Sequence, residues 1–480
     1  MNQKLILRLV GVILCIEALC MLVPLLYALV CGSPDVPAFL RSVAVCGGVG
    51  GLLALIRPSD HRLQTRDGFA CVALCWIALG LFGALPYWLS GSCGYVDAYF
   101  ETVSGLTTTG ATIFASPASL TRGIQLWRAL TQWMGGMGIL VLMLALLPKL
   151  SEGSVNLMKA ESPGPISTKL RPKTSETARI LYRIYIVLTA AEAVLLRIAG
   201  VPWFDAVTTS LTTISTGGFS IRDNSIAFYH SSLINWLLIL FMLAAAINFT
   251  LIYHAATGRL REALKSEELR VYAAIVTGAT ALITIDLIAK TGRGFGPALE
   301  HAAFQVVTLI STTGFCTEDF DLWPHFCRCI LVLVMFSGGC AGSTSGGIKV
   351  SRIVLLFKTL KRDLRRIMHS REVRPITLDG QRVTEETVSS ASVFFFVYIL
   401  LLLCGALILS LDELDFTAAF TASLTAISNV GPGLGAVGPT CNFGFLSGFS
   451  KVTMSALMLL GRLEIMPLLV LLLPSVWRRK

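Results

Sequence analysis

Long apolar blocks separated by short polar connections run through almost the whole chain. Most blocks contain about 20 residues, which is the length that crosses the core of a bilayer as an α-helix. The pattern predicts ten spans, at residues 5–30, 38–56, 69–90, 124–148, 180–200, 232–253, 271–289, 326–360, 391–411 and 451–476. The first block is longer than the apolar region of a signal peptide, about 7–15 residues, so we expect it to remain as a helix. The sequence thus indicates an all-α polytopic membrane protein embedded in a lipid bilayer.

Basic residues gather in every second connection, whereas the other connections are poor in lysine and arginine. The basic set consists of Arg57, Arg62 and Arg66; Lys149, Lys159, Lys169, Arg171 and Lys173; Arg259, Arg261, Lys265 and Arg270; the run from Lys358 to Arg382; and Arg478, Arg479 and Lys480. Because such residues favour the cytoplasmic side, we expect both termini in the cytoplasm. This orientation accounts for the net charge of +10 without a nucleic-acid partner. Only 14% of the residues are charged, against about 25% in soluble domains, which excludes a soluble protein.

Four of the outer connections contain versions of one segment. They are DAYFETVSGLTTTGAT from Asp97, DAVTTSLTTISTGGFS from Asp205, EHAAFQVVTLISTTGF from Glu300 and DFTAAFTASLTAISNVGPG from Asp415. Each begins near an acidic residue, which stabilises the positive end of a short helix, and each ends in polar residues and a glycine. The mildly apolar part, about ten residues, is too short to cross a bilayer. Each copy therefore predicts a re-entrant segment between two spans.

The end of each segment has the composition of a cation-binding loop. A short helix that ends in extended backbone directs carbonyl oxygens at one axis, and four such ends can replace the hydration shell of a cation. Glycine lets the carbonyls turn inward without a side chain in the pore. The candidate ligand residues are Thr108, Thr109 and Gly110; Thr216, Gly217 and Gly218; Thr312, Thr313 and Gly314; and Asn429, Val430 and Gly431. One copy alone could be a helix-packing element, but four copies on the same side argue against packing alone.

The apolar block 326–360 is too long for one span and contains the stretch FSGGCAGSTSGGIK from Phe336 to Lys349. Such a run of glycine and hydroxyl residues does not sustain a helix, so we expect a break within the span. A phosphate-binding loop is the alternative, but the stretch lacks the Gly-Lys-Ser/Thr ending. The last apolar block contains Arg462 and Glu464, and charges at that depth face a cavity or a partner. These two residues could form a buried ion pair.

The motifs TTTGAT, STGGFS, STTGF and NVGPGLG resemble the four filter segments of the Trk/Ktr/HKT superfamily of potassium transporters. The resemblance covers essentially the whole chain and is strongest to the bacterial TrkH/TrkG membrane subunits. It implies four tandem M1–P–M2 pore-loop repeats with pseudo-fourfold symmetry, preceded by an N-terminal helix pair. The predicted domains are the helix pair at 1–66 and the repeats at 67–150, 151–258 with a cytoplasmic loop, 259–375 with a broken second helix, and 376–480.

The same resemblance implies the function. The protein would be a non-enzymatic potassium uptake protein of the bacterial cytoplasmic (inner) membrane, with K⁺ as the transported ion and Gly110 favouring potassium over sodium. The broken helix would obstruct the pathway below the filter, and Arg462 would project into the pore as a barrier to cations. The candidate gate residues are Gly338, Gly339, Gly342, Ser343, Thr344, Gly346, Gly347, Lys349 and Arg462. Lys349 could instead be an orientation charge. The implied partners are a second copy and a nucleotide-binding regulatory subunit of the TrkA (RCK) type.

Several alternatives stay open at this point. Flux could be channel-like, coupled to protons or sodium, or less selective between sodium and potassium. Glu17 and Asp286 are isolated carboxylates within apolar blocks, and structural pairing is the favoured role of both. A secondary transporter with inverted repeats would show two related halves. A membrane enzyme would need clustered polar side chains, but the six histidines are scattered along the chain.

Overall fold

The computed structural model describes residues 2–58, 65–138, 174–369 and 375–471. Within these ranges the regular elements are helices apart from one hairpin, in which β1 (Thr377–Leu378) pairs antiparallel with β2 (Gln381–Arg382). The predicted all-α class is therefore confirmed. The end of the predicted fourth span, from 139, and the basic residues at 62, 149–173, 371–374 and 478–480 lie outside the described residues.

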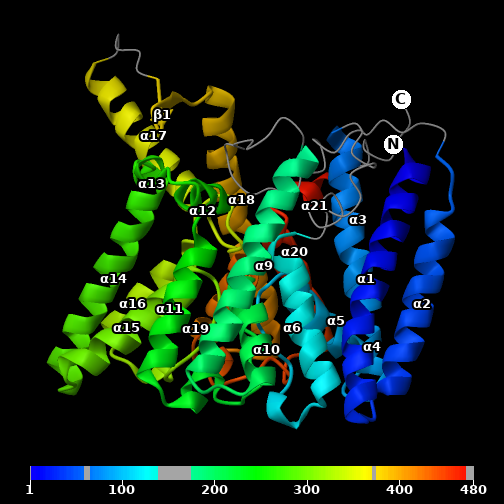
Figure 1. Ribbon diagram of the computed structural model, residues 1–480. Coiled ribbons are helices and arrows are strands. Elements are labelled where there is room, and N and C mark those ends of the chain that lie inside the picture. Colours follow the sequence, from blue (N-terminus) through cyan, green and yellow to red (C-terminus); the bar gives the residue numbers. More distant parts are fainter. Residues whose placement is uncertain (1, 59–64, 139–173, 370–374, 472–480) are drawn as a thin grey trace.

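Two helices, α1 (Gln3–Cys31) and α2 (Val36–Ala54), form the N-terminal pair that the sequence predicts. Their backbones approach closely because they meet at Gly11 and Gly50. A Cβ atom added to either glycine would collide with the backbone of the other helix. Small residues allow this kind of contact between membrane helices. The pair lies at one edge of the molecule, coloured blue (Figure 1).

Four groups of helices follow, and each has a first helix, a short helix and a second helix. We call the groups repeats 1 to 4 and their short helices the pore helices. Repeats 1 and 2 contain α3 (Thr65–Gly83), α4 (Leu85–Leu89), α5 (Tyr95–Leu106), η1 (Pro117–Ser119) and α6 (Arg122–Gly136), then α9 (Thr174–Ile198), α10 (Trp203–Ile214), η3 (Ser225–Tyr229), α11 (Ser232–Ala246) and α12 (Phe249–Ala256). Repeats 3 and 4 contain α13 (Leu260–Leu264), α14 (Glu267–Thr291), α15 (Phe295–Ile310), η4 (Phe320–Leu322), α16 (His325–Phe336) and α17 (Val350–Met368), then α18 (Glu385–Leu409), η5 (Ser410–Asp412), α19 (Phe416–Ser428), η6 (Gly435–Val437), α20 (Gly448–Arg462) and α21 (Met466–Leu471). In every repeat the pore helix packs against both the first and the second helix.

The second helices are less continuous than the apolar blocks predict. Among the described residues, five helices are long and apolar enough to cross a membrane, and α11 with α12 makes a sixth only as a pair bent by 105°. The predicted spans 232–253, 326–360 and 451–476 are each interrupted, and α6 ends at Gly136. The interruption within 326–360 is the break that the sequence predicts. At the break after α11, Asn248 caps α12 through its side chain. The Asn248 side chain replaces one hydrogen bond that a continuous helix would make, by accepting from Thr250 N at 2.8 Å.

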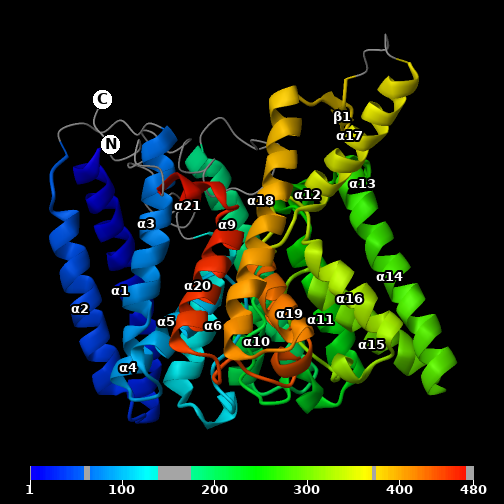
Figure 2. The same ribbon diagram turned by 180° about the vertical axis from the view of Figure 1, so that it is seen from behind.

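The pore helices α5, α10, α15 and α19 occupy the lower half of the molecule in both views (Figures 1 and 2). The hairpin, the far end of α17 and the start of α1 lie at the opposite, upper end. Most residues of the pore helices are buried, because first and second helices cover them. This arrangement brings the C-terminal ends of four short helices together in the protein interior.

Candidate functional site

The pore helices lead into four loops of the same backbone shape, here called the glycine segments (residues 107–110, 215–218, 311–314 and 428–431). The last residue of each is the aligned glycine, with a φ of 82°, 76°, 82° and 105°. The residue two before it also has a positive φ, between 55° and 59°. These residues are Thr108, Thr216, Thr312 and Asn429. A non-glycine residue in this conformation costs about 1–3 kcal/mol, so its recurrence in all four segments indicates a functional constraint.

The backbone N–H groups of each glycine segment bond back to the pore helix before it. Ser104 O accepts hydrogen bonds from Thr109 N and Gly110 N, at 2.9 and 3.5 Å. The same pattern recurs at Thr212 O, Thr308 O and Thr425 O, always six residues before the glycine, although Thr425 O accepts only from Val430 N. Among the described residues, no backbone N–H group donates to a carbonyl oxygen of these segments, so the oxygens can accept other partners.

The four glycine segments contact one another in a closed ring. A Cβ atom added to any of the four glycines would collide with the carbonyl oxygen that precedes the glycine of the next repeat. The pairs are Gly110 with Gly217 O, Gly218 with Thr313 O, Gly314 with Val430 O, and Gly431 with Thr109 O. The order of repeats 1, 2, 3 and 4 closes on repeat 1, so these oxygens gather around one axis. Only glycine combines the required φ with this close approach.

The fourth segment is built differently from the first and third. In those two, paired hydroxyls brace the loop, with 2.8 Å between the side-chain oxygens of Thr107 and Thr109 and the same distance between Ser311 and Thr313. In the fourth, Asn429 Nδ2 donates to Thr109 Oγ1 at 3.0 Å and to a backbone carbonyl of α20 at 2.9 Å. An amide thus links the fourth segment to the first.

The acidic residues near the pore helices have different positions from one repeat to the next. Asp97 and Asp205 lie in the first turns of α5 and α10, and Asp415 caps α19 through its side chain. The prediction is wrong for Glu300, because α15 begins earlier, at Phe295, and places this carboxylate in its second turn. There it accepts hydrogen bonds from side chains at the start of α11, at 2.6 Å.

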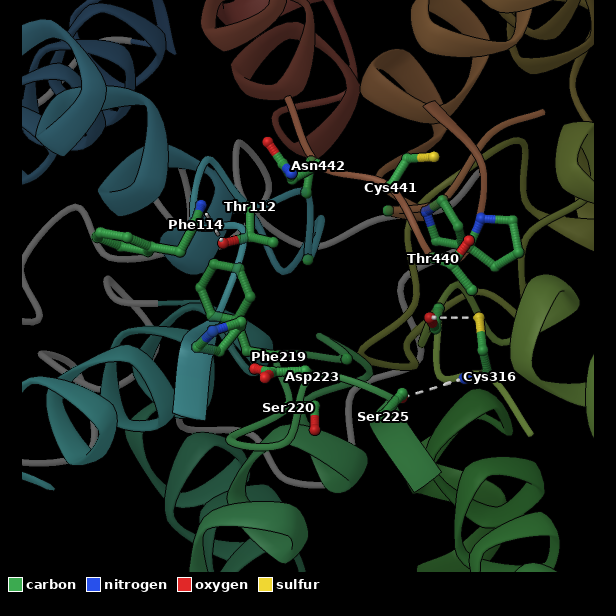
Figure 3. A pocket seen from close by; sticks show the side chains of 18 of the residues that line it. Thr112, Phe114, Phe219, Ser220, Asp223, Ser225, Cys316, Thr440, Cys441 and Asn442 are labelled. Atoms are coloured by element: carbon green, nitrogen blue, oxygen red, sulfur yellow. Dashed lines mark hydrogen bonds between the residues drawn. The ribbon is translucent and has the colours of Figure 1, made fainter. Parts of the chain in front are cut away.

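A cavity opens onto the glycine ring from the side of the loops that follow the pore helices. Its lining includes all four aligned glycines. Figure 3 shows Thr112 and Asn442 on one side of this cavity and Phe219 and Cys316 on another. Cys316 donates through Sγ to Gly314 O at 3.7 Å, directly at the ring. The ring is therefore accessible from this end.

On its other side, the ring is covered by the loop 337–349, between α16 and α17, which is the break that the glycine content predicts. Gly346 N donates to Thr312 Oγ1 at 2.8 Å, and Thr344 Oγ1 donates to Ile214 O at 3.1 Å. A Cβ atom on Gly346 would collide with Ser428 O of the fourth segment. The loop therefore contacts the C-terminal ends of three pore helices, on the side of the ring that faces α17.

The predicted loop residues fold back on one another. Gly338 N bonds to Ile348 O, Gly339 N to Ser345 Oγ at 2.8 Å, and Ser343 Oγ to Cys340 O at 2.6 Å. Gly342 and Gly347 have φ values of 72° and 65°, and Gly342 O accepts a bond from the first residue of α12. Lys349 is buried, with Nζ donating to Ser345 O, so it belongs to the loop rather than to the exposed surface.

Arg462 joins the loop to the first repeat. Its Nη1 donates to Thr344 O at 2.6 Å, and its Nη2 donates to Gly135 O and Gly136 O at 2.7 and 2.5 Å, at the end of α6. Glu464, the alternative partner considered from the sequence, pairs instead with Arg352 of α17 at 2.5 Å. Groups from all four repeats thus meet on the side of the glycine ring that faces α17.

Comparison with known proteins places this geometry in a family. The family model TrkH, described as a cation transport protein, matches residues 36–268 and 294–478. The chain belongs to the TrkH family of cation transport proteins. It is 38% identical to the Trk system potassium uptake protein TrkH of Salmonella typhimurium, with all of both chains covered, and 33% identical to TrkG of Escherichia coli, with 99% of each covered. The crystal structure of the potassium transporter TrkH from Vibrio parahaemolyticus matches with a TM-score of 0.91, at 36% identity and full coverage of both chains.

Three groups that brace the site in this TrkH-family chain were missed in the sequence. Glu268 Oε1, in the first turn of α14, accepts backbone N–H bonds from Ala341, within the loop, and from Ser351, at the start of α17, at 2.7 and 3.0 Å. Arg128 pairs with Glu101 at 2.8 Å, and both are buried behind the first and second segments. Gln132 contacts the second segment directly. The available signal was polar residues inside helices of a membrane protein.

The two isolated carboxylates differ in their partners, and only Asp286 has an ion pair among those that the structure describes. Asp286 forms an ion pair with Lys290, one helical turn away, at 2.8 Å, and accepts a bond from Cys327 Sγ at 3.2 Å. Glu17 Oε2 accepts from Cys46 Sγ at 3.6 Å. Neither residue contacts the glycine ring through these bonds.

Proposed function

We propose that this protein takes up potassium across the bacterial cytoplasmic membrane through the ring of glycine segments, with K⁺ as the transported ion. Membership of a cation transport family and the potassium uptake named for the relatives support this function. The single observation that carries it is the closed ring of carbonyl oxygens contributed by Thr109, Gly217, Thr313 and Val430. Four converging carbonyls can replace the water molecules of a dehydrated cation. The four repeats then act as one filter with pseudo-fourfold symmetry.

The loop 337–349 and Arg462 act as the gate in this proposal. An ion that leaves the ring toward α17 first meets the loop at Gly346. It then meets the guanidinium of Arg462, which is bonded to the loop at Thr344 O. A fixed positive charge repels a cation by an energy on the order of 4 kcal/mol at 4 Å, if the effective dielectric constant is about 20. Flux therefore requires the loop to move away from the axis, and Arg462 with it.

Gly110 makes the proposed filter a potassium filter. All four ring glycines are present, which in the Trk/Ktr/HKT superfamily goes with potassium preference. The asymmetry of the fourth segment, where Asn429 replaces a hydroxyl residue, is compatible with one chain that carries four non-identical repeats. Channel-like flux with lower selectivity, or coupling to protons or sodium, is the alternative that ion competition distinguishes.

The protein further assembles, in this proposal, as a homodimer with a nucleotide-binding regulatory subunit of the TrkA (RCK) type on the cytoplasmic side. Support comes from α17, which extends at the end of the molecule that also carries the start of α1 (Figure 1). A basic groove lies between this helix and the chain before β1, lined by Lys358, Lys361, Arg362, Arg365, Arg366, Pro375, Ile376 and Thr377. Basic residues on this side also favour the cytoplasm for both termini.

The decisive experiment is potassium uptake by a transport-deficient bacterial strain with and without this chain. We expect growth at low potassium and Rb⁺-tracer uptake only with the chain, and little competition from sodium. Equal competition by sodium and potassium would favour the less selective channel. Uptake that collapses with the proton or sodium gradient, at constant membrane potential, would favour a symporter. No uptake by a membrane-inserted protein would exclude the proposed function.

A further inference from the structure

Gln132 is the position at which the second helix of repeat 1 differs from those of the other repeats. It is the eleventh residue of α6, and the eleventh residues of α11, α16 and α20 are all methionine: Met242, Met335 and Met458. All four side chains are 0% exposed. Three repeats thus fill this buried site with a flexible apolar side chain, whereas repeat 1 fills it with an amide.

The backbone contacts of two glycines support this register. Three residues after Gln132, Gly135 packs on Leu106 O, and three residues after Met458, Gly461 packs on Ile427 O. Both oxygens belong to the residue four before the aligned glycine of the same repeat. The eleventh residue of the second helix therefore lies at the same level relative to the ring in repeats 1 and 4. Counting residues from the start of each second helix thus identifies equivalent positions.

The amide of Gln132 bonds directly to the second glycine segment. Nε2 donates to Gly217 O at 2.6 Å, and Oε1 accepts from Phe219 N at 3.0 Å. The carbonyl needs a donor and the N–H group needs an acceptor, so only one orientation of the amide satisfies both. Gln132 pairs with residues 217–219 as a neighbouring strand would.

The same contact explains the sequence of the second segment. Its residue before the aligned glycine is Gly217, where the other segments have Thr109, Thr313 and Val430. A Cβ atom on Gly217 would collide with the amide group of Gln132. The glutamine at 132 therefore requires a glycine at 217, although the two residues belong to different repeats.

We propose that Gln132 is a specificity-determining residue, which fixes the position of one ring oxygen and so sets the discrimination between potassium and smaller cations. This inference rests on the proposed function, because Gly217 O must be an ion ligand. Among the described residues, the equivalent oxygens of Thr109, Thr313 and Val430 receive no side-chain hydrogen bond. A carbonyl held by Nε2 cannot follow a smaller ion toward the axis. The Gly217 oxygen also accepts a hydrogen bond from Gln132 Nε2, so it attracts a bound cation less strongly than a carbonyl oxygen without a donor.

The test replaces Gln132 with the residue that the other repeats use. In proteoliposomes, Gln132→Met is expected to lower the K⁺/Na⁺ permeability ratio about tenfold, since it removes the buried hydrogen bond that holds the Gly217 carbonyl and the one to Phe219 N. Gln125→Met is the matched control. Gln125 lies on the same helix and is buried, but its amide donates to Pro117 O at 2.9 Å, outside the glycine segments. A permeability ratio does not depend on how many molecules are active, so partial misfolding cannot imitate the effect.

A third variant, Gly110→Ser, separates failure of this inference from failure of the filter itself. It is expected to lower the same ratio whatever Gln132 does. If Gly110→Ser lowers the ratio while Gln132→Met and Gln125→Met both leave it unchanged, the role of Gln132 is excluded and the filter stands. If Gly110→Ser also leaves it unchanged, the proposed filter is wrong. If Gln132→Met does not insert, Gln132→Leu removes the same two hydrogen bonds with a side chain that can neither donate nor accept, and an unchanged ratio there excludes the inference as well.

Discussion

The glycine segments share one structure across the four repeats, whereas the region next to them on the α17 side differs from repeat to repeat. Each segment repeats one set of features four times: a positive φ two residues before the glycine, a backbone bond to the sixth residue before it, and a glycine against the next carbonyl. On the side of the ring that faces α17, the second helix of each repeat is interrupted in a different way. The helix ends at Gly136 in repeat 1, bends at Asn248 in repeat 2, is broken by the loop 337–349 in repeat 3, and carries Arg462 at its end in repeat 4. Binding a spherical ion favours equivalent ligands, whereas obstructing a path needs only one movable element.

The two regions also differ in what holds them. Backbone groups and glycine contacts shape the ring, so a substitution there acts through sterics. Ionic side chains hold the loop: Arg462 on Thr344 O, Glu268 on Ala341 N, and Lys349 on Ser345 O. Charge-assisted bonds of this kind are strong, yet each can be broken by one substitution. Mutations in the ring are therefore expected to stop flux, and mutations in the loop layer to increase it.

The largest effect is expected for Gly218→Ala in the ring. Its φ of 76° disfavours any side chain, and the new Cβ would meet the Thr313 carbonyl group. A strained backbone and a displaced ring oxygen are expected to reduce potassium uptake by about 100-fold. Gly278→Ala is the control, because Gly278 lies within α14 with no atom within 4 Å of its added Cβ. Normal uptake by Gly218→Ala, at equal protein in the membrane, would contradict the steric role of the ring glycines.

An opposite and smaller effect is expected for Arg462→Ala. The change removes a positive charge, one hydrogen bond from Arg462 to the loop and two to the end of α6. Potassium flux into liposomes should therefore rise about tenfold, or about 1.4 kcal/mol. Arg462→Lys separates the two causes, since it keeps the charge and loses the forked geometry. If Arg462→Lys keeps the low flux of the unmodified protein, the positive charge rather than the hydrogen bonds forms the barrier. Unchanged flux in Arg462→Ala would exclude a barrier at this position.

The smallest effect is expected for Glu268→Ala, which removes the carboxylate that accepts from Ala341 N and Ser351 N. Flux should rise about threefold, and alkylation of the buried thiol of Cys340 should become faster, as measured by peptide mass spectrometry. Glu268→Gln keeps an oxygen at this position and is expected to restore slow alkylation. Alkylation of Cys340 at the same rate in all three proteins would show that Glu268 does not position the loop.

Much of the fold and of the site could be predicted from the sequence because local patterns encode them. Apolar length predicts membrane helices, a short apolar stretch that ends in hydroxyl residues and a glycine predicts a re-entrant segment, and the run from Phe336 to Lys349 predicts the break. These features depend on residues close in the chain. The prediction failed for Glu300 and for the spans 232–253 and 451–476, because the hydropathy pattern does not mark where a helix begins or ends.

What only the tertiary structure decided is which groups meet across repeats. Gln132 and Gly217, Arg462 and Gly135, and Glu268 and Ala341 are far apart in the sequence, yet each pair is joined by a hydrogen bond. A buried polar group must find a partner, but the sequence does not say which of many backbone groups will be within 3 Å. The sequence by itself determined four glycine segments and one broken helix. The closed order of the ring, and the side chains that brace it, follow from how four helical repeats pack around a common axis.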